Sequence, residues 1–284
     1  MPSLLRHIES CNDAAGLAGL LPWRIGAARV GFLADDVARR LRSLRGAFDV
    51  DPDGGLRLSA GDGVEARSAA LEAVVAHLAA AGVLALRREA FDVRAEPGSE
   101  ALARVDRGAL SALGVISQGV HVNGRVRRPD GLHLWVGWRS KSKGVAPGKL
   151  DNLVAGGVPA GLSPMQTLLK EAAEEASMAP GLAAKARQVS RVSYRMADGP
   201  GVRRDVLHCF DLDMPEDFTP VPADDEVERF ELWPLERLFQ AVRDTDDVKF
   251  NVNLVLIDLF LREGLVDPAS GDGKRLRANL DPGP

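Results

Sequence analysis

The sequence predicts an α+β protein of two domains, in which the larger domain carries a mixed β-sheet. Segments with alternating apolar and polar residues, typical of strands, occur in both halves of the chain. Segments with the 3.6-residue apolar period of helices lie between them. At 284 residues, 45% of them hydrophobic, the chain is long enough to bury a core in each of two domains.

Residues 1–110 are expected to form the smaller α+β domain. Two helices are expected, one from Asp35 or Asp36 to Leu44 and one over residues 66–81, which Gly82 ends. Short strands are expected around Val30, over residues 56–58 and over residues 83–86. A break at residues 95–99 precedes a helix expected over residues 100–113, so we place the domain boundary near Leu110.

The larger domain is expected to cover residues 111–266. Strand pairs are expected at residues 119–126 with 132–139 and at residues 188–195 with 205–212, each pair joined by a turn that contains glycine. A strand near residues 230–233 should lead into a helix over 234–242, and Asn251 should cap a last helix that ends at Gly264. Residues 267–284 are rich in proline, glycine, aspartate and charge, so we expect a flexible C-terminal tail.

The composition favours a cytoplasmic enzyme. The formal net charge is −4 with both signs dispersed, whereas nucleic-acid-binding proteins normally show a basic excess, so no nucleic-acid partner is expected. Cys11 and Cys209 form neither a disulfide framework nor a metal-ligand spacing, which favours free thiols in a reducing compartment. The longest apolar run, residues 73–86, is too short to span a bilayer, and the N-terminus lacks a secretory signal, so no membrane partner is expected.

A glycine-rich loop runs into a clearly marked helix between Ala155 and Met178, in the sequence AGGVPAGLSPMQTLLKEAAEEASM. Ser163 is expected at the N-cap, Pro164 at the first helical position and Gln166 at the third. This pattern is a capping box with the proline that favours a helix start. The loop therefore ends at a defined point, Ser163.

Three glutamates share one face of this helix. Residues three and four positions apart on a helix are neighbours, and this spacing brings together Glu171, Glu174 and Glu175. Each like-charged pair destabilises an isolated helix by about 0.2–0.5 kcal/mol, and Lys170 alone offsets the repulsion. A divalent cation would remove it, and oxygen ligands favour Mg²⁺, with Mn²⁺ as a substitute. The alternative interpretation is an ordinary solvated acidic face.

This segment resembles the Nudix box, in which a glycine is followed at fixed spacings by a glutamate, an Arg-Glu pair and a Glu-Glu pair. The spacing is matched from Gly156 to Met178, with Lys170-Glu171 and Glu174-Glu175 as the two pairs. Three residues depart from the pattern: Leu162 replaces the first glutamate, Lys170 the arginine and Ser177 the glycine. The first glutamate usually supports the loop or the metal site, while lysine keeps the charge of arginine without its bidentate fork.

The neighbouring segments narrow the resemblance. HVNGRV at residues 121–126 and the stretch over residues 134–157 resemble the Nudix subgroup found alone or joined to thiamine pyrophosphokinase, whose members carry an extra N-terminal domain. The resemblance implies a Nudix α/β/α sandwich with a mixed sheet behind a smaller α+β domain. It also implies pyrophosphohydrolysis of a small diphosphate compound, with oxidised or analogue thiamine diphosphate as the substrate type and the monophosphate as product.

The resemblance, together with the oxygen preference of Mg²⁺, implies a role for each polar group of the box. Glu171 and Glu175 are the expected Mg²⁺ ligands, and the Ala155 carbonyl is a candidate backbone ligand. Glu174 is expected either as a further ligand or as the partner of Lys170. We therefore expect catalysis to depend on this helix.

A general base and phosphate contacts are expected outside the box. Nudix relatives commonly supply a further carboxylate from a later loop, for which Glu226 is the first choice ahead of Asp225 and Glu228, although a solvated acidic loop is the alternative. Phosphate oxygens are expected to meet cationic side chains that precede the box, namely Arg139, Lys141, Lys143 and Lys149. For each of these a solvated surface position is the alternative.

Several alternatives stay open. The substrate could be an ADP-ribose-like or nucleotide-sugar diphosphate, because the box does not distinguish substrates. The chain could also be a binding module that has lost catalysis, for which Leu162 is the only hint. The N-terminal domain could cover the active site or mediate a homodimer. Three tryptophans could stack on an aromatic substrate or pack in the core, namely Trp135, Trp138 and Trp233.

Overall fold

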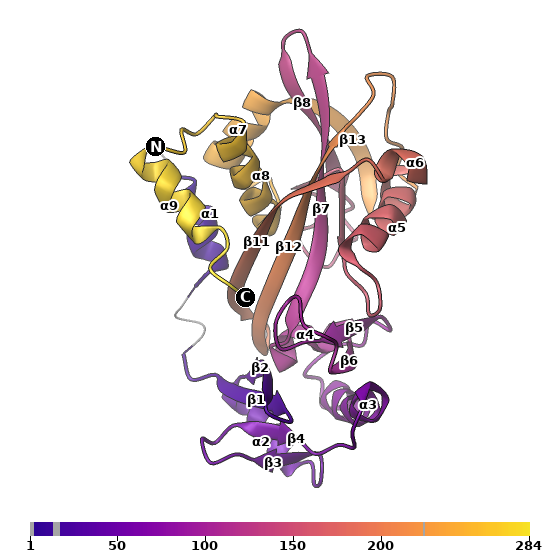
Figure 1. Cartoon of the computed structure of the whole chain (residues 1–284), viewed down its shortest axis with the longest axis vertical. Coiled ribbons are helices and arrows are strands. Elements are labelled where there is room, and N and C mark those ends of the chain that lie inside the picture. Colours follow the sequence, from indigo (N-terminus) through magenta and orange to yellow (C-terminus); the bar gives the residue numbers. More distant parts are fainter. Residues whose placement is uncertain (1–2, 14–17, 224) are drawn as a thin grey trace.

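The computed structural model describes residues 3–13, 18–223 and 225–284, and Figure 1 shows them in two parts. Within these ranges the smaller part holds a four-stranded sheet in the order β2-β1-β4-β3 and a hairpin of β5 with β6. Its elements are β1 (Leu21–Ile25), β2 (Ala28–Leu33), α2 (Asp35–Ser43), β3 (Phe48–Val50), β4 (Leu56–Leu58), α3 (Val64–Ala80), β5 (Ala90–Val93), β6 (Ala103–Asp106), η2 (Arg107–Ala109) and α4 (Leu110–Leu113).

Most elements expected in this part are confirmed, namely both helices and the strands around Val30 and at Leu56–Leu58. Two expectations are wrong. Residues 83–86 form no strand, and residues 100–113 form β6 and two short helices in place of one long helix. Ala103 and Val105 are buried with residues of α3 while Arg104 between them is exposed. This two-residue period pairs β6 with β5 and outweighs helix propensity.

A mixed sheet forms the centre of the larger part, with seven strands among the described residues. β7 (Ile116–Arg128) runs parallel to β12 (Gly201–Asp213) on one side and antiparallel to β8 (Gly131–Arg139) on the other. The remaining strands pair antiparallel with these three; they are β9 (Leu150–Asp151), β10 (Val154–Gly157), β11 (Arg187–Asp198) and β13 (Val227–Pro234). The two expected strand pairs and the strand near residues 230–233 are confirmed.

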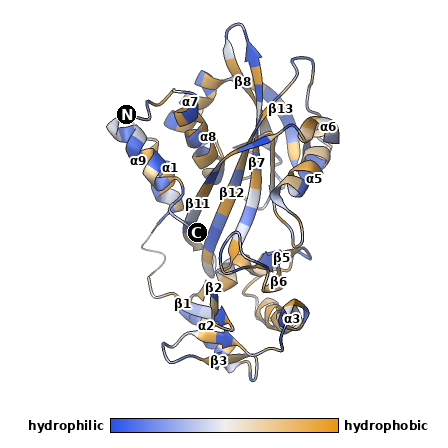
Figure 2. Ribbon diagram, in the orientation of Figure 1, coloured by the Kyte–Doolittle hydropathy of each residue, from blue (hydrophilic) through white to orange (hydrophobic). Residues whose placement is uncertain are grey.

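Helices cover both faces of this sheet, as Figure 1 shows. On one face lie α5 (Pro164–Ala176) and α6 (Pro180–Ala183), and on the other lie α7 (Leu235–Asp244) and α8 (Phe250–Arg262). A separate apolar cluster fills each interface. Figure 2 shows largely hydrophobic colours along α8, whose residues from Asn251 to Leu261 are all buried. The α+β class and the α/β/α sandwich with a mixed sheet are confirmed.

Both ends of the described chain pack against α8. α1 (Leu5–Cys11) buries Ile8 and Cys11 in the same apolar cluster as α8, although residues 1–110 were expected to form the other domain. The tail expected to be flexible contains α9 (Gly271–Asn279), which buries Leu276, and Leu280 follows it into the core. That expectation is therefore wrong, because a few leucines anchor a segment whose composition is otherwise polar.

Asn251 lies inside α8, and the N-cap of this helix is Lys249, which forms no side-chain cap. Among the helices in the described ranges, none is long and apolar enough to cross a membrane.

Candidate active site

The helix α5 starts as the sequence predicts. Ser163 Oγ accepts a hydrogen bond from Gln166 N at 3.2 Å, and Gln166 Oε1 accepts one from Ser163 N at 2.9 Å. Both halves of the capping box are thus formed, with Pro164 in the first turn. The apolar side of the helix, including Leu168 and Ala172, is buried in the cluster on this face of the sheet.

Glu175 lies almost wholly inside the protein, with 7% of its surface exposed. Its Oε2 accepts a hydrogen bond from Ala155 N at 2.9 Å. Burial raises the pKa of Glu175 well above its ordinary value, although the hydrogen bond from the Ala155 N–H lowers it in part; the charges of Asp151, Glu171 and Glu226 act in the same direction as burial. A cation beside this carboxylate would favour its charged form.

Glu171 lies against the glycine that opens the loop. A Cβ atom placed on Gly156 would come within 2.5 Å of Glu171 Cγ and Cδ, so only glycine permits this approach. Burial raises the pKa of Glu171, although the neighbouring Lys170 lowers it in part. The β10 strand and α5 therefore bring Glu171, Glu175 and the backbone of Ala155 close together.

Lys170 binds two glutamates on the exposed side of α5. Its Nζ donates to Glu174 Oε2 at 2.6 Å and to Glu171 Oε1 at 3.1 Å. Burial alone would lower the pKa of Lys170, but the hydrogen bonds to both glutamates outweigh burial and raise it. In this structure Glu174 is thus the partner of Lys170, one of the two roles left open for it.

The carboxylates fit a cation site that is completed by other oxygens. In the described part of the chain, no three acidic, histidine or cysteine side chains already converge to hold a metal ion. Glu174 pairs with Lys170, while Glu175 accepts from Ala155 N and Glu171 lies against Gly156. Mg²⁺ commonly binds through one or two carboxylates and keeps waters or substrate phosphates as its other ligands. The carboxylates of Glu171 and Glu175 fit this mode of Mg²⁺ binding.

Glu226 lies outside α5, but its charge influences the titration of two glutamates of that helix. It lies just before β13, where its backbone oxygen accepts a hydrogen bond from Ser140 N at 2.9 Å. Its charge helps to raise the pKa of both Glu171 and Glu175, and its carboxylate forms an ion pair with Lys143. Of the three candidate bases, Glu228 instead accepts a hydrogen bond from Lys141 N at 3.2 Å.

The cationic residues expected to meet phosphate lie in different surroundings. Arg139 donates to Asp151 Oδ2 at 2.6 Å and to carbonyl groups of its own loop, so its guanidinium is engaged inside the protein. Lys149 donates to the backbone oxygen of Asp246. Lys143 pairs with Glu226, and Lys141 belongs to the same exposed loop. Contact of these four residues with a substrate stays a prediction.

Asp151, in β9, is a buried centre of charge. It accepts hydrogen bonds from Arg139 at 2.6 Å and Lys249 at 3.1 Å. Burial alone would raise the pKa of Asp151, but the charges of Lys249 and Arg139 outweigh burial and lower it. Lys249 stands 98 residues further along the chain, and no local spacing in the sequence links the two.

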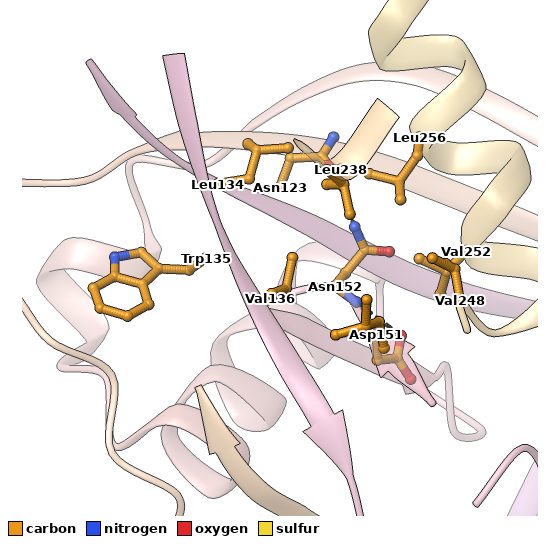
Figure 3. Close-up of a pocket in the computed structure, with 11 residues that line it drawn as sticks. Asn123, Leu134, Trp135, Val136, Asp151, Asn152, Leu238, Val248, Val252 and Leu256 are labelled. Carbon is orange, nitrogen blue, oxygen red and sulfur yellow. Dashed lines mark hydrogen bonds between the residues drawn. The ribbon is translucent and has the colours of Figure 1, made fainter. Parts of the chain in front are cut away.

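A chain of polar side chains continues from this centre into the sheet. Asn152 Oδ1 lies 2.9 Å from His121 Nδ1, and Asn152 Nδ2 donates to Asn123 Oδ1 at 2.9 Å. Burial lowers the pKa of His121 to about 4, so its ring is neutral at pH 7. Figure 3 shows Asn123 and Asn152 beside apolar side chains of β8 and α8, around a cavity of about 10 Å³.

The tryptophans divide between two faces of the sheet. Trp138 and Trp233 pack edge to face at 6.4 Å between ring centres, each covered by an arginine, Arg229 and Arg237. Trp135 packs on the opposite face, against the cluster that contains α5, and Figure 3 shows it pointing away from the cavity. Its buried Nε1 has no hydrogen-bond partner within the described residues.

Comparison with known proteins finds matches for both parts of the chain. The profile of the NUDIX domain matches residues 118–253, and that of a domain of unknown function (DUF4743) matches residues 3–117. The chain is 35% identical to Nudix hydrolase 24, chloroplastic, of Arabidopsis thaliana, over 95% of this chain and 75% of the relative. The chain belongs to the Nudix family. It is also 34% identical to Nudix hydrolase 20, chloroplastic, of the same plant, over 95% and 75% of the two chains.

As a Nudix hydrolase, the protein belongs to enzymes that act on pyrophosphate bonds and generally use a divalent metal. A crystal structure from Deinococcus radiodurans is also similar, with a TM-score of 0.46 and 21% identity, and covers 59% of this chain and 97% of that one. The two profile matches meet at residues 117 and 118, immediately after the start of β7. The Nudix box therefore lies wholly in the second region.

Proposed function

We propose that this protein is a Mg²⁺-dependent pyrophosphohydrolase that also accepts Mn²⁺. Glu171, Glu175 and the Ala155 carbonyl would hold the ion. The observation that carries the proposal is the burial of Glu175 beside the charges of Asp151, Glu171 and Glu226, an arrangement that a cation would stabilise. Carboxylate and carbonyl oxygens suit a hard cation such as Mg²⁺.

The residues around the ion have separate tasks. A bound divalent ion neutralises charge on the diphosphate and lowers the pKa of water. Glu226 would accept the proton of the attacking water, which is why its closeness to the charges of Glu171 and Glu175 matters. Lys170 would keep Glu174 and Glu171 in place through its two hydrogen bonds.

Phosphate binding falls to the loop that follows β8. Lys141 and Lys143 would meet phosphate oxygens as mobile point charges. For Lys143 this requires exchange of its ion pair with Glu226 for the substrate. Arg139 and Lys149 would contribute by fixing the loop, since both already donate to protein oxygens.

For the substrate we propose oxidised or analogue thiamine diphosphate, cleaved to the monophosphate. The support is the resemblance of residues 134–157 to the subgroup linked with thiamine. We also expect a cytoplasmic protein, and a homodimer remains a prediction without a contact to support it.

A panel of diphosphates at equal Mg²⁺ tests the proposal. We expect oxidised or analogue thiamine diphosphate to show a kcat/KM at least about tenfold, or about 1.4 kcal/mol, above that of ADP-ribose, nucleotide sugars and intact thiamine diphosphate. A tenfold preference for ADP-ribose or a nucleotide sugar would leave a hydrolase and remove the thiamine assignment. If the folded protein binds these compounds and cleaves none of them, the binding-module alternative holds.

A further inference from the structure

The hairpin β5–β6 of the N-terminal domain contacts the loop that precedes α5. Ala160 N donates to Ala90 O at 2.8 Å, which extends β5 towards the loop. Gly161 N donates to Asp92 Oδ2 at 3.3 Å. Figure 1 places this hairpin between the body of the N-terminal domain and the lower end of the Nudix sheet, beside the loop that leads into α5.

A third contact involves Gly157, the last residue of β10. A Cβ atom on Gly157 would come within 2.8 Å of Phe91 Cζ, so the absence of a side chain lets the Phe91 ring lie against the end of β10. The Arg107 guanidinium covers the same ring at 5.8 Å from its centre. Three successive residues of β5 therefore meet the segment from Gly157 to Gly161.

Asp92 is the polar member of this group, and it is well placed to hold the loop. Its side chain is 12% exposed, and Arg94 donates to the same Oδ2 atom at 2.7 Å, which fixes the carboxylate. Asp92, Arg94 and Leu162 line one hollow of about 180 Å³ between the two domains. Leu162 stands where the Nudix box has its first glutamate, so the carboxylate in this hollow comes from the other domain.

The same loop connects these contacts with β5 to Glu171 and Glu175. At its beginning, the Ala155 N–H holds Glu175 and Gly156 lies against Glu171. At its end, Ser163 caps the helix that carries both glutamates. A displacement of the middle of the loop would therefore move the backbone that meets the carboxylates.

We propose that Asp92 is a positioning residue for the metal site: through Gly161 it holds the loop in the conformation that brings Ala155 and Gly156 to Glu175 and Glu171. In this chain the N-terminal domain thus replaces the loop support that the missing glutamate at position 162 would give. The proposal rests on the proposed function only in that Glu171 and Glu175 bind a divalent cation.

The test measures Mn²⁺ binding by electron paramagnetic resonance in the full chain, and hydrogen exchange of the backbone amides over residues 156–162. For Asp92→Ala we expect binding weaker by about tenfold, as for other groups that orient metal ligands, and faster exchange in the loop. Asp92→Asn should bind nearly as well as wild type, because its amide oxygen can still accept from Gly161 N. Asp92→Ser should behave like alanine, since its hydroxyl is too short to reach.

The matched control is Asp49→Ala. Asp49 is a carboxylate of the same domain that accepts a hydrogen bond from Ser59 Oγ at 2.8 Å, but it is exposed and lies in β3, at the far end of the molecule from α5 in Figure 1. It should change neither Mn²⁺ binding nor loop exchange. Wild-type binding by folded Asp92→Ala, or by folded Asp92→Ser, would overturn the proposal.

The same measurements separate this proposal from the function it rests on. If wild type binds Mn²⁺ and Glu175→Gln abolishes that binding, the metal site stands whatever Asp92 does. If Glu175→Gln leaves Mn²⁺ binding unchanged, the proposed metal site itself fails. Loop exchange reports on Asp92 in either case, because it requires neither the ion nor a substrate.

Discussion

Glu175 shows at the scale of one residue how a functional group destabilises its own fold. Its pKa is raised by burial and by three neighbouring carboxylates. A folded-state pKa above the unfolded value means that the ionised group lowers stability at high pH, and that this penalty fades as the pH falls towards the ordinary value of 4.5. The metal-free site is therefore strained electrostatically at neutral pH.

The first residue-scale prediction follows from this sign. Glu175→Gln keeps the shape of the side chain and an oxygen that can accept from Ala155 N. We expect it to raise the melting temperature of the metal-free protein at pH 8, with the difference vanishing near pH 4.5. Turnover of the best substrate should fall by about 100-fold or more. Calorimetry and steady-state kinetics measure the two effects.

Glu236→Gln is the control, because Glu236 is an exposed glutamate of α7. It should leave both the melting temperature and the turnover close to wild type. If Glu175→Gln retains most of the wild-type activity, catalysis does not depend on α5. A lower melting temperature at pH 8 would show that the carboxylate has a compensating partner in solution.

At the scale of elements, one carboxylate ties together three parts of the Nudix domain. Asp151 in β9 meets Arg139 at the end of β8 and Lys249 at the start of α8. All three side chains are nearly buried, with 8%, 11% and 13% of their surfaces exposed. Removal of the acid would leave two buried cations without their shared partner, which costs far more than loss of a surface pair.

We therefore expect Asp151→Asn to lower the free energy of unfolding by about 3–5 kcal/mol, measured by urea denaturation. Asp246→Ala is the matched control, since Asp246 pairs with Arg6 at 2.7 Å but has a side chain that is 81% exposed. Its effect should stay within about 1 kcal/mol. Equal effects of the two substitutions would mean that the Asp151 cluster does not stabilise the junction of these elements.

At the scale of the whole molecule, the two ends of the described chain complete the Nudix core. Ile8 from α1 and Leu276 and Leu280 from the C-terminal segment share one apolar cluster with α8. Leu280 O also accepts a hydrogen bond from Ser193 N at 3.0 Å, which ties the C-terminal segment to β11. The residues of α8 from Asn251 to Leu261 are all buried, because these end segments pack against the helix in addition to the sheet.

This arrangement predicts a large effect of Leu276→Ala. Leu276 is 3% exposed, and truncation of a buried leucine typically lowers the free energy of unfolding by about 2–5 kcal/mol. Leu86→Ala, at a leucine that is 50% exposed, should change it by less than about 0.5 kcal/mol. Indistinguishable denaturation midpoints for the two variants would restore the description of residues 267–284 as a flexible tail.

Features with local causes could be predicted from the sequence. The capping box, the start of α5 and the shared face of its glutamates depend on residues within one or two helical turns, so they could be predicted with their correct residues. The strand pairs around β7 and β12 likewise follow from alternation and turn residues. The family resemblance rests on the same short-range spacing.

Contacts between distant residues could not be predicted from the sequence and became visible in the folded chain. Arg139 pairs with Asp151, and Asp151 also pairs with Lys249, 98 residues further along the chain. Asp92 reaches the loop at Gly161, 69 residues away, and no periodicity in the sequence encodes that approach. The physical reason is that ion pairs and loop contacts form wherever folding brings chain segments together, whereas spacing along the chain specifies only neighbours within one helix or hairpin.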